Sequence, residues 1–367
     1  MRKKGYYLTV ENYGSSGVEK KINMQLKCFS SCFDIQRIVI ESKKISLLHR
    51  IFNILPFRSL ERRYDVALDK IKSPNFVYIR RTYADKKNIM FIKSIRDKYP
   101  DCKIIVELPV YPYDKEMKRS LYTRFLLIKE KHYREYYKRY IDRFVTYSKD
   151  DSIFGVSTII TMNGVDTDSI STICPSRDYD LNNINLIAIA QFAPHHGYER
   201  IIQGFYDYYK TEQHKIVHLH LIGDGTEKRK YIKMVNKYQL GDKIHFHEPM
   251  YGSDLDDMYD IADAGLNAFG VYKDGFSDLC TIKAREYLAK GLPVILGAKD
   301  RLFDNTEYGL FFSNDASPID INRIVEFVDN LYKTKSREKI IEEIRNFAKE
   351  NVDNVITMKP IIEYINE

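Results

Sequence analysis

The sequence predicts an α/β protein of two doubly wound domains, each built on a parallel sheet between helices. The chain has 367 residues, which is more than one ordinary hydrophobic core holds and enough for two domains. Short β-branched or aromatic runs alternate with longer amphipathic stretches, a pattern typical of βα units. The alternation is interrupted once, at the polar, turn-rich residues 167–183, so we expect the linker between the domains there.

Six strands are expected in each half of the chain. They cover residues 5–10, 36–40, 75–79, 103–108, 143–148, 158–162, 185–190, 217–222, 243–247, 264–268, 293–296 and 309–312. Helical periodicity lies between most of them, for instance at 227–239. The expected domains are therefore 1–166 and 184–348. A C-terminal helix, 349–367, is expected to pack back on the first domain and to be kinked or restarted by Pro360.

Composition excludes several classes of protein. Apolar residues make up 44% and charged residues 30%, as in a soluble globular enzyme and unlike a collagen-like or disordered chain. No apolar run approaches the roughly 18 residues of a membrane helix. The first residues lack the apolar region of a secretory signal, and the five cysteines do not form a zinc-site pattern. Reduced cytoplasmic thiols are the expectation.

The net charge of +7 is unevenly distributed along the chain. Residues 1–170 carry 34 Lys and Arg against 20 Asp and Glu, whereas residues 171–367 carry 24 against 31. The basic half would suit a phospholipid surface or a nucleic acid, or simply have solvated basic helix faces. No nucleic-acid-binding module accompanies the charge, so no nucleic acid is expected as a partner. Residues 46–64 and 124–144, cationic with interleaved apolar or aromatic residues, are candidates for a bilayer interface or for a core-facing stripe.

Residues 14–17 form a glycine turn between the first expected strand and the next helix. Such a turn lets an anion approach the helix N-terminus, although many βα turns use glycine only for a sharp reversal. The turn is not a full GxGxxG, and only Glu41 follows the second strand as an acidic residue. A nicotinamide-dependent enzyme is therefore poorly supported.

Residues 277–295 carry more specific chemistry, as a loop, a helix and a buried strand. Thr281 is placed to cap the helix and Gly291 to end it. Lys283 and Glu286 share a face near the helix start, where a cation and free N–H groups would hold a diphosphate and a carboxylate would take a ribose diol. The alternatives are a solvated lysine and a surface pair of Glu286 with Lys290.

These residues resemble the family 4 glycosyltransferases, whose GT-B fold has two Rossmann-like domains facing across a cleft. Gly223-Asp224-Gly225 is similar to the family's Gly-x-Gly turn, and Glu286 with AKGLPVI to its second Glu and helix end. Asp278 stands where the family has its first Glu. In the first half, residues 16–19 resemble the acceptor-side glycine loop and residues 163–166 the domain-ending Asn-Gly-Val-Asp.

The chain departs from the family pattern at two cations. Gln191 stands in place of an Arg and His196 in place of a Lys, before Gly197. His196 is expected to donate a hydrogen bond and to be cationic below a pKa of about 6.5. Lys283 and Arg285 are the expected substitutes for the missing charge. The family's usual His after the fourth strand is not evident; residues 106–116 stand there.

The resemblance implies a role for eleven residues. It implies catalytic roles for Asp278, Lys283 and Glu286, and donor contacts for Gln191, His196, Gly197, Gly223, Thr281 and Arg285. It places Gly17 and Glu107 on the acceptor side. Glu107 would be a base if the reaction inverts the anomeric centre, or otherwise a strand-end residue in a polar loop. The resemblance implies a retaining reaction, and no metal or other cofactor is expected.

The predicted function is transfer of a sugar from a nucleotide-sugar donor to a glycan or lipid-diphosphate-linked acceptor. The setting would be capsule, exopolysaccharide or lipopolysaccharide assembly, in the cytoplasm or peripherally at the inner face of the membrane. One alternative is a catalytically idle protein of the same fold that stabilises a partner glycosyltransferase. Another is a sugar-nucleotide epimerase, which would need no acceptor.

Overall fold

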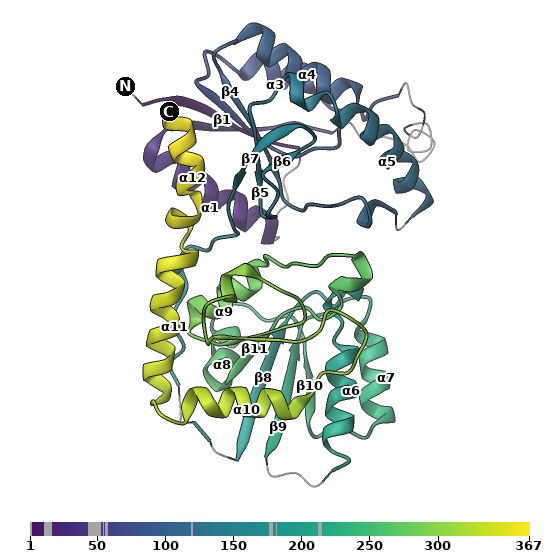
Figure 1. Cartoon of the computed structure of the whole chain (residues 1–367), viewed down its shortest axis with the longest axis vertical. Helices are drawn as coiled ribbons and strands as arrows, with labels where there is room; N and C mark the ends of the chain where they lie inside the picture. Colours follow the sequence, from purple (N-terminus) through teal and green to yellow (C-terminus); the bar gives the residue numbers. More distant parts are fainter. Residues whose placement is uncertain are drawn as a thin grey trace. The chain divides into compact units, whose positions relative to one another are not determined.

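The computed structural model describes residues 2–10, 17–42, 53, 55, 58–118, 120–175, 179–180, 182–211 and 215–367. The chain forms two compact units (Figure 1). Unit 1 consists of Met1–Met162 with Asn354–Glu367, and unit 2 of Asn163–Asp353. Most of the glycine turn 14–17, much of the cationic stretch 46–64 and part of the expected linker 167–183 lie outside the described residues.

Unit 1 is a seven-stranded sheet in the order β2-β1-β3-β4-β5-β7-β6. All of its pairings are parallel except the one between β6 and β7. The strands are β1 (Lys4–Thr9), β2 (Asp34–Val39), β3 (Phe76–Arg80), β4 (Lys103–Leu108), β5 (Arg143–Thr146), β6 (Ser152–Ile153) and β7 (Val156–Ile160). Its helices are α1 (Gly17–Cys32), α3 (Tyr64–Lys70), α4 (Lys86–Lys98), α5 (Leu121–Arg134) and α12 (Asn354–Asn366), with short 3-10 turns η1 (Glu116–Lys118) and η2 (Tyr137–Arg139).

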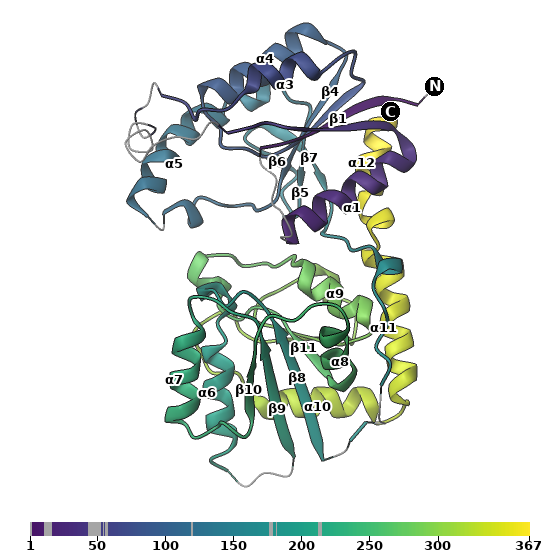
Figure 2. The ribbon, with the colours of Figure 1, turned by 180° about the vertical axis from the view of Figure 1, so that it is seen from behind.

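Helices cover both faces of this sheet because successive side chains of each strand point to opposite faces. Tyr6 and Leu8 of β1 join α3 and α4 in one hydrophobic cluster. Tyr7 of the same strand joins α1 and α12 in the other. Unit 1 is therefore doubly wound, as the sequence predicts (Figure 2).

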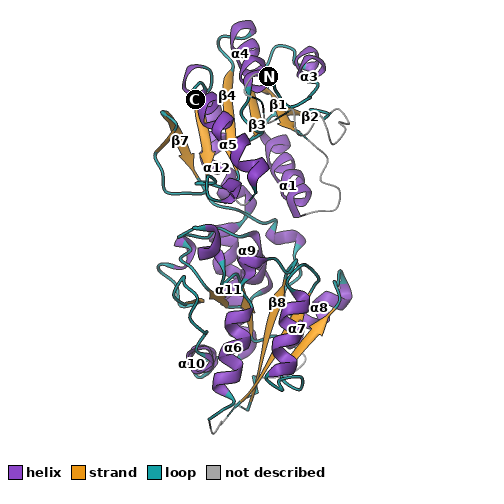
Figure 3. Cartoon of the chain, turned by 90° about the vertical axis from the view of Figure 1, so that its right-hand side faces the viewer, coloured by secondary structure: helices purple, strands orange, loops and turns teal. Residues whose placement is uncertain are grey.

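Unit 2 is a six-stranded parallel sheet in the order β10-β9-β8-β11-β12-β13. Its strands are β8 (Asn183–Ile189), β9 (Ile216–Ile222), β10 (Ile244–His247), β11 (Ala264–Leu266), β12 (Val294–Leu296) and β13 (Gly309–Phe311). Its helices are α6 (Glu199–Tyr208), α7 (Lys228–Lys237), α8 (Ser253–Ile261), α9 (Ile282–Lys290), α10 (Ile321–Tyr332) and α11 (Arg337–Val352), with 3-10 turns η3 (Thr167–Ser169), η4 (Pro194–His196), η5 (Val271–Asp274) and η6 (Arg301–Phe303). Figure 3 shows the helices around the strands of each unit.

Among the parallel strands of each sheet the chain order reverses once, next to the first strand of the unit. In unit 2 the chain passes from β8 to β9 on one side and later returns to β11 on the other. Ligands of doubly wound sheets bind at the carboxyl ends of the strands at such a point. The loops that follow β8, β9 and β11 are therefore where a site is sought.

The C-terminal segment returns to unit 1. Met358, Ile361 and Ile365 of α12 are buried against α1, and the Asn354 side chain donates to the carbonyl of Met24 at 2.9 Å. The helical break lies at Asp353, between α11 and α12, and Pro360 lies inside α12. The expectation that Pro360 would restart the helix is therefore wrong.

The break at Asp353 coincides with a contact to a distant part of the chain. The Asp353 backbone is extended, and its carboxylate accepts hydrogen bonds from the backbone N–H and hydroxyl of Thr167 at 3.2 and 2.5 Å.

Within the part of the chain that is described, no helix is both long and apolar enough to cross a membrane.

Candidate functional site

The loops after β8 and β11 of unit 2 meet through their backbones. Gly197 has φ +62°, and a Cβ atom there would lie 2.4 Å from the backbone nitrogen of Gly270. The N–H of Phe269 donates to the carbonyl of His196 at 2.8 Å, and that of Gly270 to His195 at 3.1 Å. Glycine is required at Gly197 because both its backbone conformation and this close approach exclude a side chain.

The Gly-x-Gly turn after β9 packs against the same loop. Gly223 and Gly225 have φ +136° and +152°. A Cβ atom on Gly223 would lie 1.9 Å from the carbonyl oxygen of Ala190, and one on Gly225 2.5 Å from that of Phe192. The two glycines therefore let three loops come together at the carboxyl ends of β8, β9 and β11.

Helix α9 begins at this edge with the predicted cap. The Thr281 hydroxyl accepts from the N–H of Ala284 at 3.3 Å and donates to the buried Asn267 side chain, just after β11, at 3.1 Å. The helix ends at Gly291, whose left-handed backbone is the expected C-cap. Both predictions are confirmed. The Asn267 contact fixes the start of α9 relative to β11.

Lys283 lies in the first turn of α9 in a half-buried position. Its Nζ donates to the hydroxyl of Tyr198 at 3.1 Å, and no described carboxylate lies within ion-pair distance of it. Burial lowers the pKa of Lys283 from 10.5 to about 7, and the nearby Glu286 only partly opposes this shift. The side chain is therefore a poorly neutralised cation that would gain from an added negative charge.

His196 is neutral in this setting. Burial, with Lys283 and His195 nearby, lowers its pKa to about 2. Its Nδ1 accepts a hydrogen bond from the Ala193 N–H at 3.1 Å, so the ring proton resides on Nε2. The imidazole stacks on Tyr198 with ring centroids 5.6 Å apart. The expectation that His196 becomes cationic below about pH 6.5 is therefore wrong, although the ring keeps one N–H to donate.

Arg285, the second expected substitute cation, is fully buried in α9. Its two amino groups bind the carboxylate of the equally buried Asp300, with Nη2 2.8 Å from Oδ1. The guanidinium charge is thus matched inside the fold. This placement favours a structural role for Arg285 over contact with a donor.

Glu286 lies one turn beyond Lys283 and is half-buried. Lys290, its expected partner in a surface pair, is buried and instead binds Asp256 and the hydroxyl of Ser171, the latter at 2.7 Å. Asp256 is thereby used in an ion pair, and no side-chain hydrogen bond caps α8.

Asp278 and Gln191 are both exposed at this edge of unit 2. The Ser277 hydroxyl donates to Asp278 at 2.6 Å, and the neighbouring N–H of Leu279 donates to the carbonyl of Lys299 at 2.7 Å. The loop before α9 is thus tied to the loop after β12. Gln191 follows β8 in the loop that carries His196 and Gly197.

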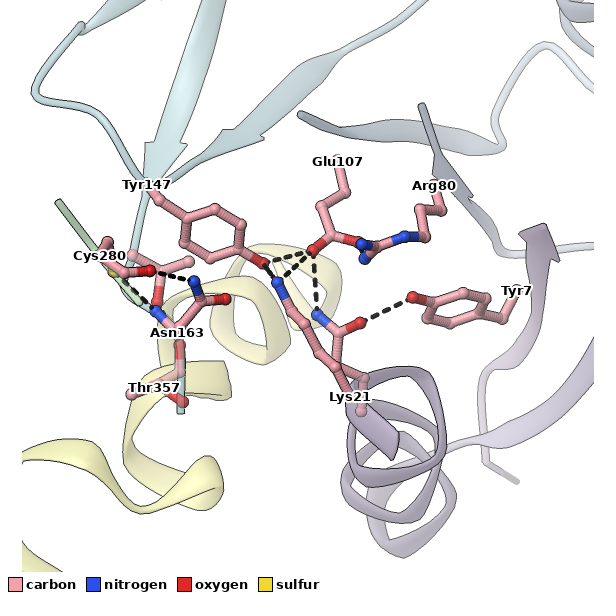
Figure 4. A network of polar contacts seen from close by, with 10 residues as sticks. Tyr7, Lys21, Arg80, Glu107, Tyr147, Asn163, Cys280 and Thr357 are labelled. Atoms are coloured by element: carbon pink, nitrogen blue, oxygen red, sulfur yellow. Dashed lines mark hydrogen bonds and ion pairs between the residues drawn. The ribbon is translucent and has the colours of Figure 1, made fainter. Parts of the chain in front are cut away.

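In unit 1 Glu107 is the centre of a buried polar network (Figure 4). Its carboxylate lies 3.0 Å from the Lys21 ammonium and 3.0 Å from the Arg80 guanidinium, and it also accepts from the Tyr147 hydroxyl. These cations and the tyrosine outweigh the effect of burial and lower the pKa of Glu107 to about 2.

This network changes the interpretation of Glu107. Glu107 is the second-last residue of β4, so its position at the strand end is as expected, but the residue is fully buried and the expectation of a polar loop is wrong. A carboxylate with so low a pKa is also a weak general base near neutral pH. Gly17, the other residue expected on the acceptor side, is the exposed first residue of α1, and a Cβ atom there would meet no atom of the described residues within 4 Å.

Sequence reasoning missed several residues that shape these two sites. In unit 2 they are Tyr198 and Asn267, which position Lys283 and Thr281. In unit 1 they are Lys21 and Tyr147. Asn267 could have been found as the polar residue near the carboxyl end of the predicted strand 264–268, whereas no signal in the sequence pairs Tyr198 with Lys283.

Comparisons with known proteins agree with this geometry. Residues 177–347 match the family described as Glycosyl transferases group 1. No curated protein matches the sequence significantly.

Three solved structures that are similar to this chain align with it over almost their whole length. Alr3699/HepE of Anabaena in complex with UDP is 13% identical, with 99% of each chain covered and a TM-score of 0.66. Sucrose-phosphate synthase from Thermosynechococcus elongatus is 12% identical, with 100% of this chain and 98% of that chain covered and a TM-score of 0.65. The lipopolysaccharide outer core galactosyltransferase WaaB is 13% identical, with 100% of each chain covered and a TM-score of 0.59. The chain therefore has the GT-B fold of two parallel-sheet α/β domains, and its residues 177–347 match the group 1 glycosyl transferases.

Proposed function

We propose that the protein is a glycosyltransferase that uses a nucleotide-sugar donor bound at the carboxyl edge of unit 2. The observation that carries the proposal is Lys283, a half-buried and poorly neutralised cation in the first turn of α9. It lies among loops that approach closely through Gly197 and Gly223. Support comes from the group 1 match over residues 177–347 and from similar structures solved with UDP or UDP-glucose.

The proposed chemistry places the donor diphosphate at the start of α9. Cleavage of the bond between the sugar and the diphosphate leaves negative charge on the departing phosphate. The free N–H groups of the helix N-terminus and the Lys283 ammonium would stabilise that charge without a metal. His196 would contribute one hydrogen bond from Nε2. Glu286, one turn further, would accept from the ribose hydroxyls, and Asp278 would face the sugar.

The acceptor in this proposal is a glycan or a lipid-diphosphate-linked glycan, with the anomeric configuration retained. The pathway would be capsule, exopolysaccharide or lipopolysaccharide assembly. A protein bound peripherally at the cytoplasmic face of a membrane would meet such an acceptor. The basic first half of the chain, with 34 Lys and Arg against 20 Asp and Glu, supports that location.

A second candidate function is an inactive partner protein of the same fold. It is favoured by Gln191 and by the neutral His196, since both stand where the family has a cation. Such a protein would bind a nucleotide sugar weakly or not at all, and it would not release nucleoside diphosphate. An epimerase of this fold would instead convert one free nucleotide sugar into another without an acceptor.

The test is calorimetric titration with a panel of nucleotide sugars, followed by assays of nucleotide release and sugar interconversion. Lys283→Ala should weaken binding of the preferred donor by about one to two decades, since a hydrogen bond to a charged group contributes about 1.5–3 kcal/mol. Lys237→Ala is the matched control, because Lys237 is an exposed cation in the last turn of α7. If no nucleotide sugar binds to the wild type, or if both variants bind equally well, the donor site is not at α9.

A further inference from the structure

Helix α5 of unit 1 exposes three large apolar side chains on one side. Leu121, Phe125 and Ile128 are 72%, 50% and 67% exposed. Their spacing of four and three residues places them in one row along the helix. The opposite side of α5 is buried through Leu126, Leu127 and Glu130. The exposed row is therefore a second apolar face that the fold of unit 1 does not use.

Cations surround this row. Lys118, Arg124 and Lys131 are exposed beside it, and Lys138 and Arg139 are exposed just beyond the helix. Residues 118–139 contain eight Lys and Arg but only two acidic residues. One of these two, Glu130, is buried and paired with Arg81, so it does not offset the surface charge. Asp114 offsets part of it, since it pairs with Lys131 at 3.2 Å and with Arg134 at 2.7 Å.

The helix is held firmly while it presents this face. The Lys129 ammonium donates to the backbone carbonyl of Arg58 at 2.8 Å, and the Tyr83 hydroxyl donates to that of Leu126. Ser120 caps the first turn by accepting from the Thr123 N–H at 3.1 Å. In Figures 1 and 2 α5 lies on the side of unit 1 opposite α12. The row and its cations thus form one preformed surface.

We propose that this surface of α5, made by Leu121, Phe125 and Ile128 with their flanking cations, docks on an anionic phospholipid bilayer. A helix with a short apolar row and basic flanks lies in the interface plane, where its apolar side chains enter the acyl boundary and its cations meet lipid phosphates. The inference deepens the proposed function, on which it rests for a lipid-linked acceptor, by naming the face that would meet the membrane.

The dimensions of the surface favour lipid over a second copy of the chain. A stable protein interface buries about 1,200–2,000 Å² with complementary packing. Three side chains in one row of α5 supply only a small part of that area. The excess of positive charge would also repel an identical surface, whereas it complements an anionic bilayer.

The test is sedimentation of the full-length protein with vesicles of phosphatidylcholine alone or mixed with phosphatidylglycerol. The wild type should bind the mixed vesicles, and binding should fall as salt rises from about 0.05 to about 0.5 M, because ions screen charge over about 10 Å at 0.1 M. Replacing Leu121, Phe125 and Ile128 together by Ser should lower the partition constant at least about tenfold. Arg124→Glu should weaken binding to the mixed vesicles alone.

A matched control uses the other end of unit 1. Val355 and Ile356 of α12 are 65% and 45% exposed, and replacing both by Ser removes exposed apolar surface from a different helix. This variant should bind vesicles like the wild type. Equal melting temperatures of the two variants would verify that both are folded, since all five replaced side chains are exposed.

Three results would overturn the inference. They are no binding to anionic vesicles at low salt, equal loss in the α5 and α12 variants, or an α5 variant that keeps vesicle binding but turns a dimer into a monomer. Nucleotide-sugar titration of the same α5 variant separates this inference from the donor proposal, because its donor affinity should be unchanged. If the wild type binds vesicles but no nucleotide sugar, the result would support the lipid-binding surface and contradict the donor proposal.

Discussion

At the scale of single residues, Lys283 combines a basic side chain with surroundings that disfavour its charge. Its pKa of about 7 means that the folded chain holds this proton less tightly than the unfolded chain, whose lysine titrates near 10.5. A diphosphate would bind the protonated form. Donor affinity should therefore be constant below about pH 7 and should fall by up to about tenfold per pH unit above it.

Calorimetric titration of a nucleotide sugar between about pH 6 and about pH 9 measures this dependence, since the diphosphate diester itself does not titrate there. Lys283→Arg should flatten the profile, because guanidinium stays charged throughout. A wild-type profile as flat as that of the arginine variant would contradict the role given to Lys283.

Arg285, two positions further along α9, is expected to contribute to stability and not to donor binding. Replacing it by Ala leaves the Asp300 carboxylate buried without its cation, which should lower the free energy of unfolding by about 3–5 kcal/mol. Lys283→Ala removes a cation that burial disfavours and should leave stability nearly unchanged or raised. Urea unfolding of the two variants at neutral pH compares them. Equal small losses would mean that the Arg285–Asp300 pair contributes little.

The sequence predicts the local part of the site and not the long-range part. Thr281 as N-cap and Gly291 as C-cap are predictable because capping depends on residues three or four positions away. The contact of Lys283 with Tyr198 joins residues 85 positions apart, and the low pKa of His196 follows from burial created by the whole loop. Neither the Lys283–Tyr198 contact nor the burial of His196 can be predicted from a single sequence.

At the scale of elements, the strands are more predictable than their boundaries. All twelve predicted strands are present, because buried parallel strands consist of short runs of β-branched and aromatic residues that can be recognised in the sequence. One further strand, β6, was not predicted, because its two residues are too few to show any periodicity. The sequence predicts a kink or a restart of the C-terminal helix at Pro360, whereas the helix breaks at Asp353, whose carboxylate accepts a hydrogen bond from the Thr167 N–H.

The neighbouring strands β9 and β10 carry a row of four histidines that the sequence reasoning did not interpret. His218 and His245 lie 3.2 Å apart through Nδ1 and Nε2, and His220 and His247 lie 3.1 Å apart in the same way. Burial and the other histidines lower the pKa of His220 to about 4, and the pKa values of His218 and His247 are lowered too. At neutral pH His218, His220 and His247 are therefore neutral.

This row should make unit 2 sensitive to acid. As pH falls below about 6.5 the unfolded chain takes up protons that the folded strands resist, so stability is lost in that range. His220→Gln should reduce the loss of unfolding free energy between about pH 7 and about pH 5 by about 1–2 kcal/mol. Urea unfolding at the two pH values measures it, with the exposed His132 of α5 changed to Gln as the control. If the wild type and His220→Gln lose equal unfolding free energy in acid, His220 does not cause the acid sensitivity.

At the scale of the whole molecule, the chain leaves unit 1 after Met162, builds unit 2 and returns with α12. The return is a packing requirement, because Met358, Ile361 and Ile365 complete the hydrophobic cluster that α1 forms on one face of the sheet. Without α12 that face would expose part of its core. The chain therefore connects the two units at two places, after Met162 and after Asp353. The stability of unit 1 depends on the last fourteen residues of the chain.

Replacing Ile361, which is fully buried, by Ala should cost unit 1 about 2–5 kcal/mol, the range for a large-to-small change in a core. Ile356→Ala, on the same helix but largely exposed, should cost less than about 0.5 kcal/mol. Native-state hydrogen exchange followed by peptide resolves where the loss falls. For Ile361→Ala, protection should drop in β1, β3 and β4 of unit 1 and stay unchanged in β8 and β9 of unit 2, because the side chain packs only into the unit 1 cluster. An equal drop in both units would mean that they unfold as one cooperative body, and no drop in either would mean that α12 is not needed to close the unit 1 core.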